Sequence, residues 1–530
     1  MNRRVFLLYF AALFLAGLGS LALLPPLEGF DESAHLSSLR EIAAGEIPVY
    51  GESRIDRLVE GYKGPAPYGS LTPPFDAGLT YKKFFADPVQ VETYLSLYRT
   101  PRNAAPYAPG EGMNWEAQHP PLYYALMAPL ERATEALPFV TQIFILRLFS
   151  FLLALAGIAF GMLALCRPHA PVQDSAALRG FLFYPLLLPM LFPEFTRISN
   201  DSLCLFLAGS LALLLSRWAH DEKNTRLSLA IGLTLGLGLL TKAFFIPIAL
   251  ATALFMALRL RESFDAAALP QRLKILARAL IPALIIGGGW YLYKYMATGD
   301  IIGGNDAIRL AQEGGLMGGL AKHFSLFAFL RGFAVVIASW VWAGTWSLAR
   351  PPALMLLPLL AALLWAVGAF IAEVRRRPLS DPAWFPVYLF GFFGLGFFWH
   401  ILQSVALNGN GNTPGWYLHI LMPWAAPALG IGIAKIRQHR ARGVFTGLLI
   451  YAGLFQLAMI WAQFALFTGC AVKGEDKIYG FTARGFCLPE APMLMHRLAI
   501  TGWPSLAALG FIGAILCGAF LLAHLRKQDI

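Results

Sequence analysis

Acidic and imidazole side chains are grouped at the start of the first long hydrophilic segment, directly after an apolar run that ends at Leu24. The group lies in the sequence Pro25-Pro26-Leu27-Glu28-Gly29-Phe30-Asp31-Glu32-Ser33-Ala34-His35. If the part after the prolines is helical, Asp31 and His35 share one face at the i, i+4 spacing. Two adjacent carboxylates, Asp31 and Glu32, at an apolar boundary favour a general base. The alternative is structural, with Asp31 capping a helix and Glu32 favouring its dipole.

A second group closes the same segment, in Glu116-Ala117-Gln118-His119-Pro120-Pro121-Leu122-Tyr123-Tyr124. Pro120 restricts His119 to an extended backbone, and the two prolines favour the start of a new helix. The imidazole is therefore expected at a fixed corner. A histidine at such a corner is often purely structural. Because the two groups bracket one segment, however, we expect Glu116 and His119 to share a site with the acidic group.

Cations at the ends of later apolar runs could bind an anionic substrate. Lys242 is the only charged residue between positions 227 and 258, which is costly in a membrane unless the side chain reaches the surface or has a function. Arg197 and Asp201 belong to one short turn, where Asn200 and Asp201 either cap the next helix or contact a substrate. Further candidate cations are Lys294 and Arg331.

Tyr417 and His419 begin another apolar run, after a loop rich in glycine and asparagine. They either meet a ligand's phosphate or head group or belong to the aromatic belt at the membrane surface. Trp340, Trp342 and Trp346 allow the same two interpretations, sugar stacking or anchoring at the interface, and anchoring is favoured.

The composition describes a chain whose solvent is a lipid bilayer. Of its 530 residues, 57% are hydrophobic and 14% are charged, and the mean hydropathy is +0.58. A soluble globular protein carries roughly a quarter charged residues, so an ordinary soluble enzyme, a disordered chain and a small disulfide-rich secreted domain are all excluded. We expect an all-α polytopic membrane protein with about 12 membrane-spanning helices. The expected spans are residues 1–24, 141–165, 179–194, 201–218, 227–240, 244–258, 276–296, 352–373, 384–404, 416–434, 444–468 and 503–525.

The positions of lysine and arginine predict the topology, because short cytoplasmic loops are enriched in them. Arg3 and Arg4 place the N-terminus in the cytoplasm, and alternate loops collect basic residues on the same side. These residues are Arg167, Arg179, Arg217, Lys223, Arg226, Arg259, Arg261, Arg272, Lys274, Arg375, Arg376, Arg377, the cluster from Lys435 to Arg442, Arg526 and Lys527. The net charge of +11 is thus a cytoplasmic rim, and no nucleic-acid partner is expected. We expect a cytoplasmic (inner) membrane protein with both termini inside.

Two segments are ambiguous. Residues 227–258 could form one long helix, but two short spans with Lys242 at their outer turn keep the charge rule intact. By the same parity, residues 322–347 are predicted to form interfacial helices rather than another crossing.

The hydrophilic segment 25–140 holds 15 Asp and Glu against 9 Lys and Arg, and we expect it to form a folded extracytoplasmic domain after the first span, residues 1–24. A helical bundle, residues 141–525, is expected to follow, with a cytoplasmic tail at 526–530. The other outer loops are 298–351, 405–415 and 469–502. Cys470 and Cys487 both fall in the last of these, so a disulfide between them is an open alternative to free thiols. The cysteines expected to be plain apolar residues are Cys166, Cys204 and Cys517.

In type and order, the segments Phe30-Asp31-Glu32-Ser33-Ala34-His35 and His119-Pro120-Pro121-Leu122-Tyr123-Tyr124 resemble motifs of the C-type glycosyltransferase (GT-C) superfamily. Families such as the protein O-mannosyltransferases and the lipid A aminoarabinose transferases have an acidic motif just after the first span. The motifs occupy about the first quarter of the chain, whereas the topology is similar along most of it. The resemblance implies a GT-C-like fold with Asp31 as the catalytic base, assisted by Glu32 and His35.

The activity implied is inverting transfer of a sugar from a polyprenyl-phosphate donor to an extracytoplasmic glycan, lipid or protein acceptor. Residues expected to bind the substrate or its lipid phosphate are Glu116, His119, Arg197, Asp201, Lys242, Tyr417 and His419. The superfamily has metal-requiring and metal-independent branches, and without a DxD-like pair in the outer loops we expect no metal cofactor. The alternatives are a transporter or flippase of lipid-linked saccharides, which would place charges near the midplane, and an oligosaccharide ligase or polymerase, which typically has its large outer loop late in the chain.

Overall fold

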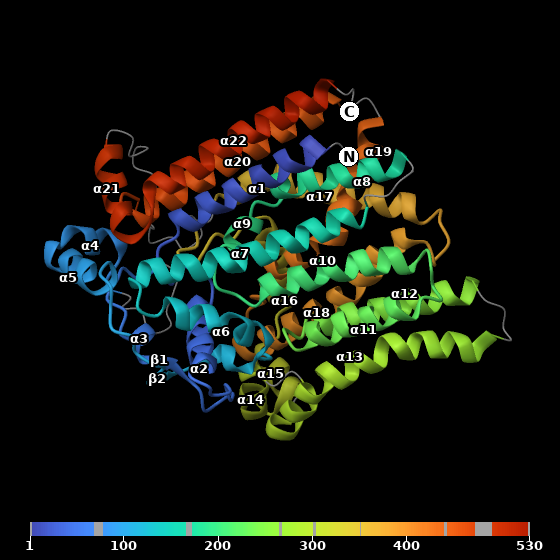
Figure 1. The fold of residues 1–530 in the computed structure, drawn as a ribbon, viewed down its shortest axis with the longest axis horizontal. Helices are drawn as coiled ribbons and strands as arrows, with labels where there is room; N and C mark the ends of the chain where they lie inside the picture. The colour runs from blue at the N-terminus through green and yellow to red at the C-terminus, as the bar shows by residue number, and fades with distance from the viewer. Residues whose placement is uncertain are drawn as a thin grey trace.

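The structure, a computed structural model, describes residues 3–67, 78–165, 172–263, 268–299, 301, 304–349, 351–438, 442–471 and 490–527. Across these ranges most of the chain is helical, and there are two short strands (Figure 1). Long helices run side by side through most of the molecule, and the smaller elements of the segment between α1 and α7 gather at one end of them. The predicted fold class, an all-α polytopic membrane protein, is confirmed.

Nine helical segments of the described chain are long and apolar enough to cross a membrane. They consist of α1 (Arg3–Leu23), α7 (Phe139–Leu163), α10 (Asp201–Trp218), α13 (Leu269–Thr298), α17 (Ala353–Val374), η3 (Pro382–Trp384) with α18 (Phe385–Asn408), η4 (Trp416–Leu421) with α19 (Met422–Gln438), α20 (Arg442–Phe467) and α22 (Pro504–Lys527). A sequence of about twenty apolar residues suffices because each residue adds 1.5 Å to a helix and the hydrocarbon layer is roughly 30 Å thick.

The three remaining expected spans coincide with shorter or more charged helices. These are α8 (Val172–Leu187), α11 (Thr225–Leu239) and α12 (Phe245–Ser263). The break between α11 and α12 contains Lys242, as the two-helix interpretation of residues 227–258 predicts. Pro247 lies in the first turn of α12, where a proline does not interrupt helical hydrogen bonds.

The segment between the first two spans folds into a small domain of short elements. They are α2 (Glu32–Ala43), β1 (Arg54–Asp56), α3 (Arg57–Glu60), α4 (Tyr81–Ala86), α5 (Pro88–Tyr98), β2 (Pro109–Met113), η1 (Trp115–Gln118) and α6 (Leu122–Thr134). The strands pair antiparallel with Arg54 opposite Met113 and Asp56 opposite Pro109, so the register contains a bulge. Helix α2 packs against α6, which brings the two ends of the segment together.

Further short helices complete the fold, namely α9 (Leu191–Phe195), α14 (Asn305–Gln312), α15 (Gly315–His323), α16 (Leu326–Val341) and α21 (Ala491–Thr501). Helices α15 and α16 meet at an angle of 105°. Trp340 and Trp342 are only 7% and 5% exposed, and their indole N–H groups donate to Tyr184 and to the carbonyl of Ala349. The expectation that these two residues anchor the protein at a lipid interface is therefore wrong, because helix packing covers them.

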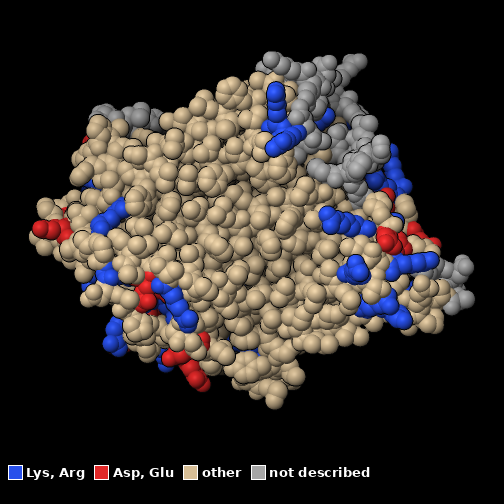
Figure 2. All heavy atoms as spheres, in the orientation of Figure 1, with Lys and Arg blue, Asp and Glu red and all other residues tan. Residues whose placement is uncertain are grey.

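The two ends of the molecule differ from its middle. Figure 2 shows a broad uncharged belt between two ends that carry the Lys, Arg, Asp and Glu side chains. Cys470, just after α20, is disulfide-bonded. Cys487, the partner that the sequence suggests, lies outside the described residues. Cys166, most of the loop 469–502 and most of the tail 526–530 also lie outside them. Cys204 and Cys517 are free thiols, as predicted.

Close helix contacts depend on glycine at facing positions. A Cβ atom built on Gly157 of α7 would lie 2.3 Å from the carbonyl oxygen of Leu205 on α10, and one on Gly209 would lie 2.0 Å from that of Gly157. Small residues let the backbones of membrane helices approach this closely. The α7–α10 contact matters for the site described below because both helices carry charged residues of that site at their outer ends.

We expect Gly157→Leu to lower the thermal unfolding temperature of the purified protein, because overpacking costs about 1–3 kcal/mol or more. Gly368→Leu on α17 is the matched control, since nothing lies within 4 Å of a Cβ at that position. Equal melting temperatures for the two variants, measured in the same detergent, would contradict the close α7–α10 contact.

Candidate active site

The turn between α1 and α2 is held by an arginine from another helix. Arg147 of α7 donates from Nε and Nη2 to the two carboxylate oxygens of Glu32, at 2.7 and 2.6 Å. The same guanidinium donates to the backbone carbonyls of Leu24 and Pro25, at 2.6 and 2.7 Å. Arg147 is 2% exposed and Glu32 is fully buried. Glu32 is thus committed to positioning the turn.

Asp31, the residue next to Glu32, is differently placed. It stands at the N-cap of α2 but its side chain makes no capping hydrogen bond. Instead the indole of Trp115 donates to Asp31 Oδ1 at 3.0 Å, and the residue is partly exposed. Burial and the nearby Glu116 carboxylate raise the pKa of Asp31 to about 6, although Arg197 and Lys242 act in the opposite direction. This carboxylate can therefore exchange a proton near neutral pH.

The backbone around Asp31 is strained. Among the described non-glycine residues, a positive φ is found at Leu27 (62°), Asp31 (57°) and Leu348 (48°). Aspartate tolerates this region, whereas leucine does so at a cost of about 1–3 kcal/mol. Such outliers cluster at functional sites when the surrounding structure holds them in place.

Glu28 connects the loop that contains Leu27 and Asp31 to the loop that contains Leu348. The hydroxyl of Thr345 and the backbone N–H of Ser347 each donate to Glu28 Oε1 at 2.7 Å, and the Tyr81 hydroxyl donates to Oε2 at 2.6 Å. Glu28 is fully buried, and burial raises its pKa. The loop before α17 is thereby fixed against the loop that carries Asp31.

A group of imidazoles and a second carboxylate lies beside Asp31, as the sequence predicts. His119 Nε2 lies 3.0 Å from Glu116 Oε2, and His35 Nδ1 lies 3.5 Å from the same oxygen. His35 is also hydrogen-bonded to the hydroxyl of Tyr124 at 2.8 Å. The backbone of His119 is extended and α6 begins just after Pro121, as expected from the double proline.

The environments of the two carboxylates separate their pKa values. Burial opposes ionisation of Glu116, but His35, His119 and Lys242 outweigh it and lower the pKa of Glu116 to about 2. Glu116 therefore stays ionised where Asp31 titrates. Two carboxyl groups whose pKa values are pushed apart in this way are suited to different roles in acid–base chemistry.

Two of the four predicted cations, Arg197 and Lys242, lie in a buried network at the same end of the bundle. Arg197 Nη2 donates to Glu194 Oε1 at 2.8 Å and to Asp201 Oδ2 at 3.2 Å, and Nη1 donates to the carbonyl of Phe30 at 2.5 Å. Lys242 Nζ donates to Asp201 Oδ1 at 2.8 Å. Lys242 does not snorkel, because it is only 5% exposed.

Aromatic rings face the ammonium group of Lys242. Its Nζ lies 4.6 Å from the ring centre of Phe244 and 4.8 Å from that of Tyr417. Next to Tyr417, Trp416 stacks on Phe30 with ring centres 4.2 Å apart. The start of η4 therefore packs against Lys242 and against Phe30, the residue before Asp31. Contact of Tyr417 with a ligand stays a prediction.

Several buried polar atoms in the α9–α10 turn lack a protein partner. Asn200 is fully buried at the N-cap of α10, yet neither its amide nitrogen nor its amide oxygen is hydrogen-bonded within the described part of the chain. The same holds for Ser202 Oγ and Arg197 Nε. Buried polar groups are nearly always paired, so this group of atoms is suited to contact a ligand or water. Asn200 does not act as a side-chain cap.

Three other predicted residues lie elsewhere or are already engaged. His419 is fully buried; its Nε2–H donates to the carbonyl of Trp340 at 3.0 Å, and its Nδ1 accepts from Tyr184 at 3.1 Å. Lys294 faces the rings of Tyr50 and Trp290. Arg331 is exposed, 3.5 Å from the amide oxygen of Asn410. None of the three has a described contact with Asp31.

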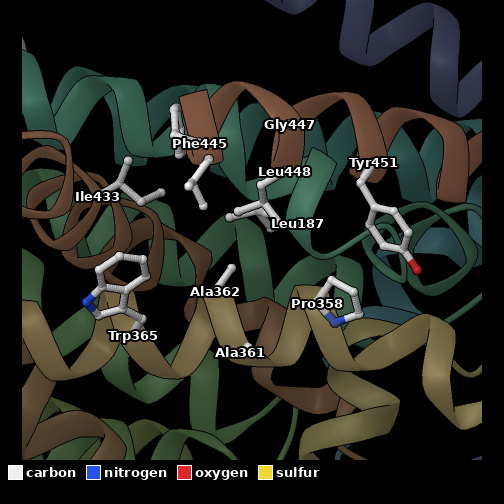
Figure 3. Close-up of a pocket in the computed structure, with 11 residues that line it drawn as sticks. Leu187, Pro358, Ala361, Ala362, Trp365, Ile433, Phe445, Gly447, Leu448 and Tyr451 are labelled. Atoms are coloured by element: carbon white, nitrogen blue, oxygen red, sulfur yellow. The ribbon is translucent and has the colours of Figure 1, made fainter. Parts of the chain in front are cut away.

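An apolar groove opens on the side of the bundle. Figure 3 shows its walls, which come from α8, α17, α19 and α20 and enclose about 460 Å³. It includes Leu187 at the end of α8, and Met190, three residues later, belongs to the small apolar cluster that contains Phe30. The groove is lined almost wholly by apolar groups, so it suits a hydrocarbon chain.

Among the residues that the structure describes, no three His, Cys, Asp or Glu side chains are arranged to hold a metal ion. The expectation that no metal takes part stays a prediction.

The sequence matches the model of a family described as "Predicted membrane protein (DUF2142)" over residues 14–394. The chain belongs to this family. The comparison with curated proteins gives no match. The crystal structure of ArnT from Cupriavidus metallidurans bound to undecaprenyl phosphate is similar at 14% identity and a TM-score of 0.41, with 98% of this chain and 78% of that chain covered. That likeness is too distant to inform the site.

The residues that sequence reasoning missed in this DUF2142 protein are partners from distant segments. Arg147, Trp115 and Glu194 contact Glu32, Asp31 and Arg197 respectively. A charge inside an apolar run was the available signal for Arg147, since such a charge needs a reason. For Trp115, adjacency to Glu116 offered only a weak signal.

We expect Arg147→Met to destabilise the protein by about 3–5 kcal/mol, because it leaves the buried Glu32 carboxylate unpaired. The double variant Glu32→Gln/Arg147→Met should recover much of this loss, since no charge remains buried. Denaturant unfolding of the two single variants and the double variant measures the coupling. Strictly additive effects would contradict the importance of the ion pair.

Proposed function

We propose that this protein is an inverting glycosyltransferase that moves a sugar from a polyprenyl-phosphate donor to an extracytoplasmic acceptor, with Asp31 as the general base. The order of the acidic and His-Pro-Pro motifs supports this class, and the geometry around Asp31 supports the role.

The state of Asp31 carries the proposal. Among the carboxylates at this end of the bundle, Glu32 and Asp201 are buried in ion pairs with arginine or lysine. Asp31 is partly exposed, and Trp115 is its one side-chain hydrogen-bond donor among the described residues. A general base works best when its pKa lies near the operating pH, because it is then largely deprotonated and still binds a proton well. The pKa of Asp31, about 6, is close to that value at neutral pH.

The proposed reaction needs little more than a base and cations. Asp31 takes the proton from an acceptor hydroxyl or amine, whose oxygen or nitrogen attacks the anomeric carbon from the face opposite the phosphate. The bond between that carbon and the phosphate oxygen breaks, and the polyprenyl phosphate leaves with the bonding electron pair. The configuration at the anomeric carbon is inverted.

Lys242 and Arg197 are the groups proposed to stabilise the departing phosphate. Each already pairs with Asp201, but Lys242 has three N–H groups and Arg197 Nε has no protein partner among the described residues. A phosphate oxygen held there would gain charge-assisted hydrogen bonds in a site that excludes bulk water. The Asn200 amide, which has no hydrogen-bond partner among the described residues, adds a neutral contact.

The apolar groove is proposed to take part of the donor's hydrocarbon chain. The groove reaches Leu187, and Met190, three residues later, packs in one apolar cluster with Phe30, the residue before Asp31. Burial of such a chain is favourable by about 0.8 kcal/mol for each methylene group.

Asp31→Asn should reduce kcat by about 10²–10⁴-fold, the usual contribution of a general base. The wild-type rate should also fall below about pH 6, because protonated Asp31 cannot accept a proton, and should level off above that pH. Release of polyprenyl phosphate from a labelled donor by the purified protein measures both effects.

Glu92→Gln is the control, because Glu92 is an exposed carboxylate of the same outer domain. It should leave the rate and its pH profile unchanged. Parental turnover by Asp31→Asn would overturn the assignment of the base. If the wild-type protein moved a lipid-linked saccharide between leaflets without cleaving the donor, the enzyme class itself would be wrong and a flippase would replace it.

Lys242→Gln should weaken binding of a non-hydrolysable donor analogue about tenfold or more, whereas Lys242→Arg should keep most of the affinity because it keeps the charge. Asp201 stays paired with Arg197 in both variants. Analogue binding to protein in lipid nanodiscs tests this, and unchanged affinity in Lys242→Gln would remove Lys242 from the phosphate site.

A further inference from the structure

A second hollow lies at the opposite end of the bundle from Asp31. It encloses about 360 Å³ between the start of α11 and the start of α13, and its lining residues are Lys223, Pro270, Gln271, Lys274, Ile275 and Arg278. Lys242 marks the outer ends of α11 and α12, so this hollow, at the other end of α11, faces the cytoplasmic side expected from the positions of the basic residues.

The hollow concentrates positive charge. Lys274 and Arg278 are one helical turn apart on α13, at a spacing where like charges repel, and Lys223 lies across from them. The Arg278 guanidinium is fixed toward α11 because its Nη1 donates to the Thr225 hydroxyl at 2.7 Å. An anion held between these groups would relieve the repulsion.

The two acidic residues just before Lys223 are engaged with other groups. Glu222 accepts from Arg259 of α12 at 2.7 Å, and the Asp221 carboxylate accepts from the amide of Asn224 at 3.0 Å. The described lining residues themselves include no carboxylate. The hollow thus has the charge of an anion site.

The surface next to the hollow is apolar. On α13, which is a candidate membrane span from its first residue, Leu269 and Leu273 are 54% and 56% exposed. Ile281 and Leu284, farther along the same helix, are exposed as well. Lys274 therefore stands where α13 enters the hydrocarbon layer, with leucines beside it that would contact acyl chains. A soluble anion has no acyl chains to contact these leucines.

We infer that the hollow between α11 and α13 binds the phosphate head group of an anionic phospholipid of the cytoplasmic leaflet. The phosphate lies among Lys223, Lys274 and Arg278, and the acyl chains follow the exposed apolar face of α13. Basic pockets between membrane helices on this side commonly bind such head groups. The site is separate from the proposed sugar transfer and does not depend on it.

The closely packed α11–α13 pair gives the bound lipid a structural effect. A Cβ atom on Gly232 of α11 would lie 2.5 Å from the carbonyl oxygen of Ala279 on α13, and the Tyr291 hydroxyl of α13 donates to the carbonyl of Leu239 at 2.9 Å. A lipid that contacts the first turns of both helices should therefore stabilise the folded protein.

The test uses the full-length protein in a zwitterionic detergent, with phosphatidylglycerol, phosphatidylcholine and inorganic phosphate as separate probes. We expect phosphatidylglycerol, but not phosphatidylcholine, to bind and to raise the melting temperature. Lys274→Gln/Arg278→Gln should weaken phosphatidylglycerol binding about tenfold or more, since it removes two of the three charges that attract the phosphate. Native mass spectrometry and thermal unfolding are the two readouts.

Arg375→Gln/Arg376→Gln is the matched control, because it removes two exposed charges from the same side of the protein away from the hollow. It should bind phosphatidylglycerol like the wild type. Equal loss in both double variants would mean that the whole basic rim attracts the lipid and would overturn the inference. Stabilisation by millimolar inorganic phosphate equal to that by phosphatidylglycerol would reveal a soluble-anion site and overturn it too. If the double variant is unstable, Lys274→Gln alone, at an exposed position, gives the same comparison.

Discussion

The ion pair between Arg147 and Glu32 is the interaction on which the candidate site depends. A buried carboxylate and a buried guanidinium are each costly, and they persist because their geometry satisfies both. The guanidinium also donates to the carbonyls of Leu24 and Pro25, just past the end of the first helix. Pro25 lacks the N–H group that would continue that helix. One side chain of α7 therefore determines where the first span ends and where α2 begins. The direction in which Asp31 points follows from it.

Environment, rather than residue type, distinguishes the carboxylates at this end of the protein. Glu32 and Asp201 are surrounded by cations at hydrogen-bond distance, so they fix the positions of other groups. Glu28 has neutral donors and joins two loops. Among the described residues, Asp31 has a single indole donor, and it is partly exposed. The carboxylates of Glu28, Glu32 and Asp201 thus have structural roles, whereas that of Asp31 is the candidate base.

The fold was largely predictable, because hydropathy and the positions of basic residues depend only on local sequence. Helix pairing was not, since it depends on contacts such as Gly157 with Gly209, which no local pattern reveals. The proximity of Asp31, Glu116 and His119 was also predicted correctly, because these residues lie at the two ends of one segment. His419 misled because an imidazole at the start of an apolar run can equally be a core residue whose two nitrogens are both satisfied. Trp340 misled similarly, because exposure cannot be read from residue type.

The strained turns give an independent reason to place function at this end. Leu27, Asp31 and Leu348 adopt positive φ in two loops that Glu28 joins, and a relaxed turn with glycine at these positions would be more stable. The Asn200 amide and Arg197 Nε, which lack hydrogen-bond partners in the part of the chain that the structure describes, add a further cost in the same region. A fold selected only for stability would relieve such costs by simple substitutions. These costs are concentrated around Asp31. Such an arrangement is expected where stability is given up to orient reacting groups before a substrate arrives.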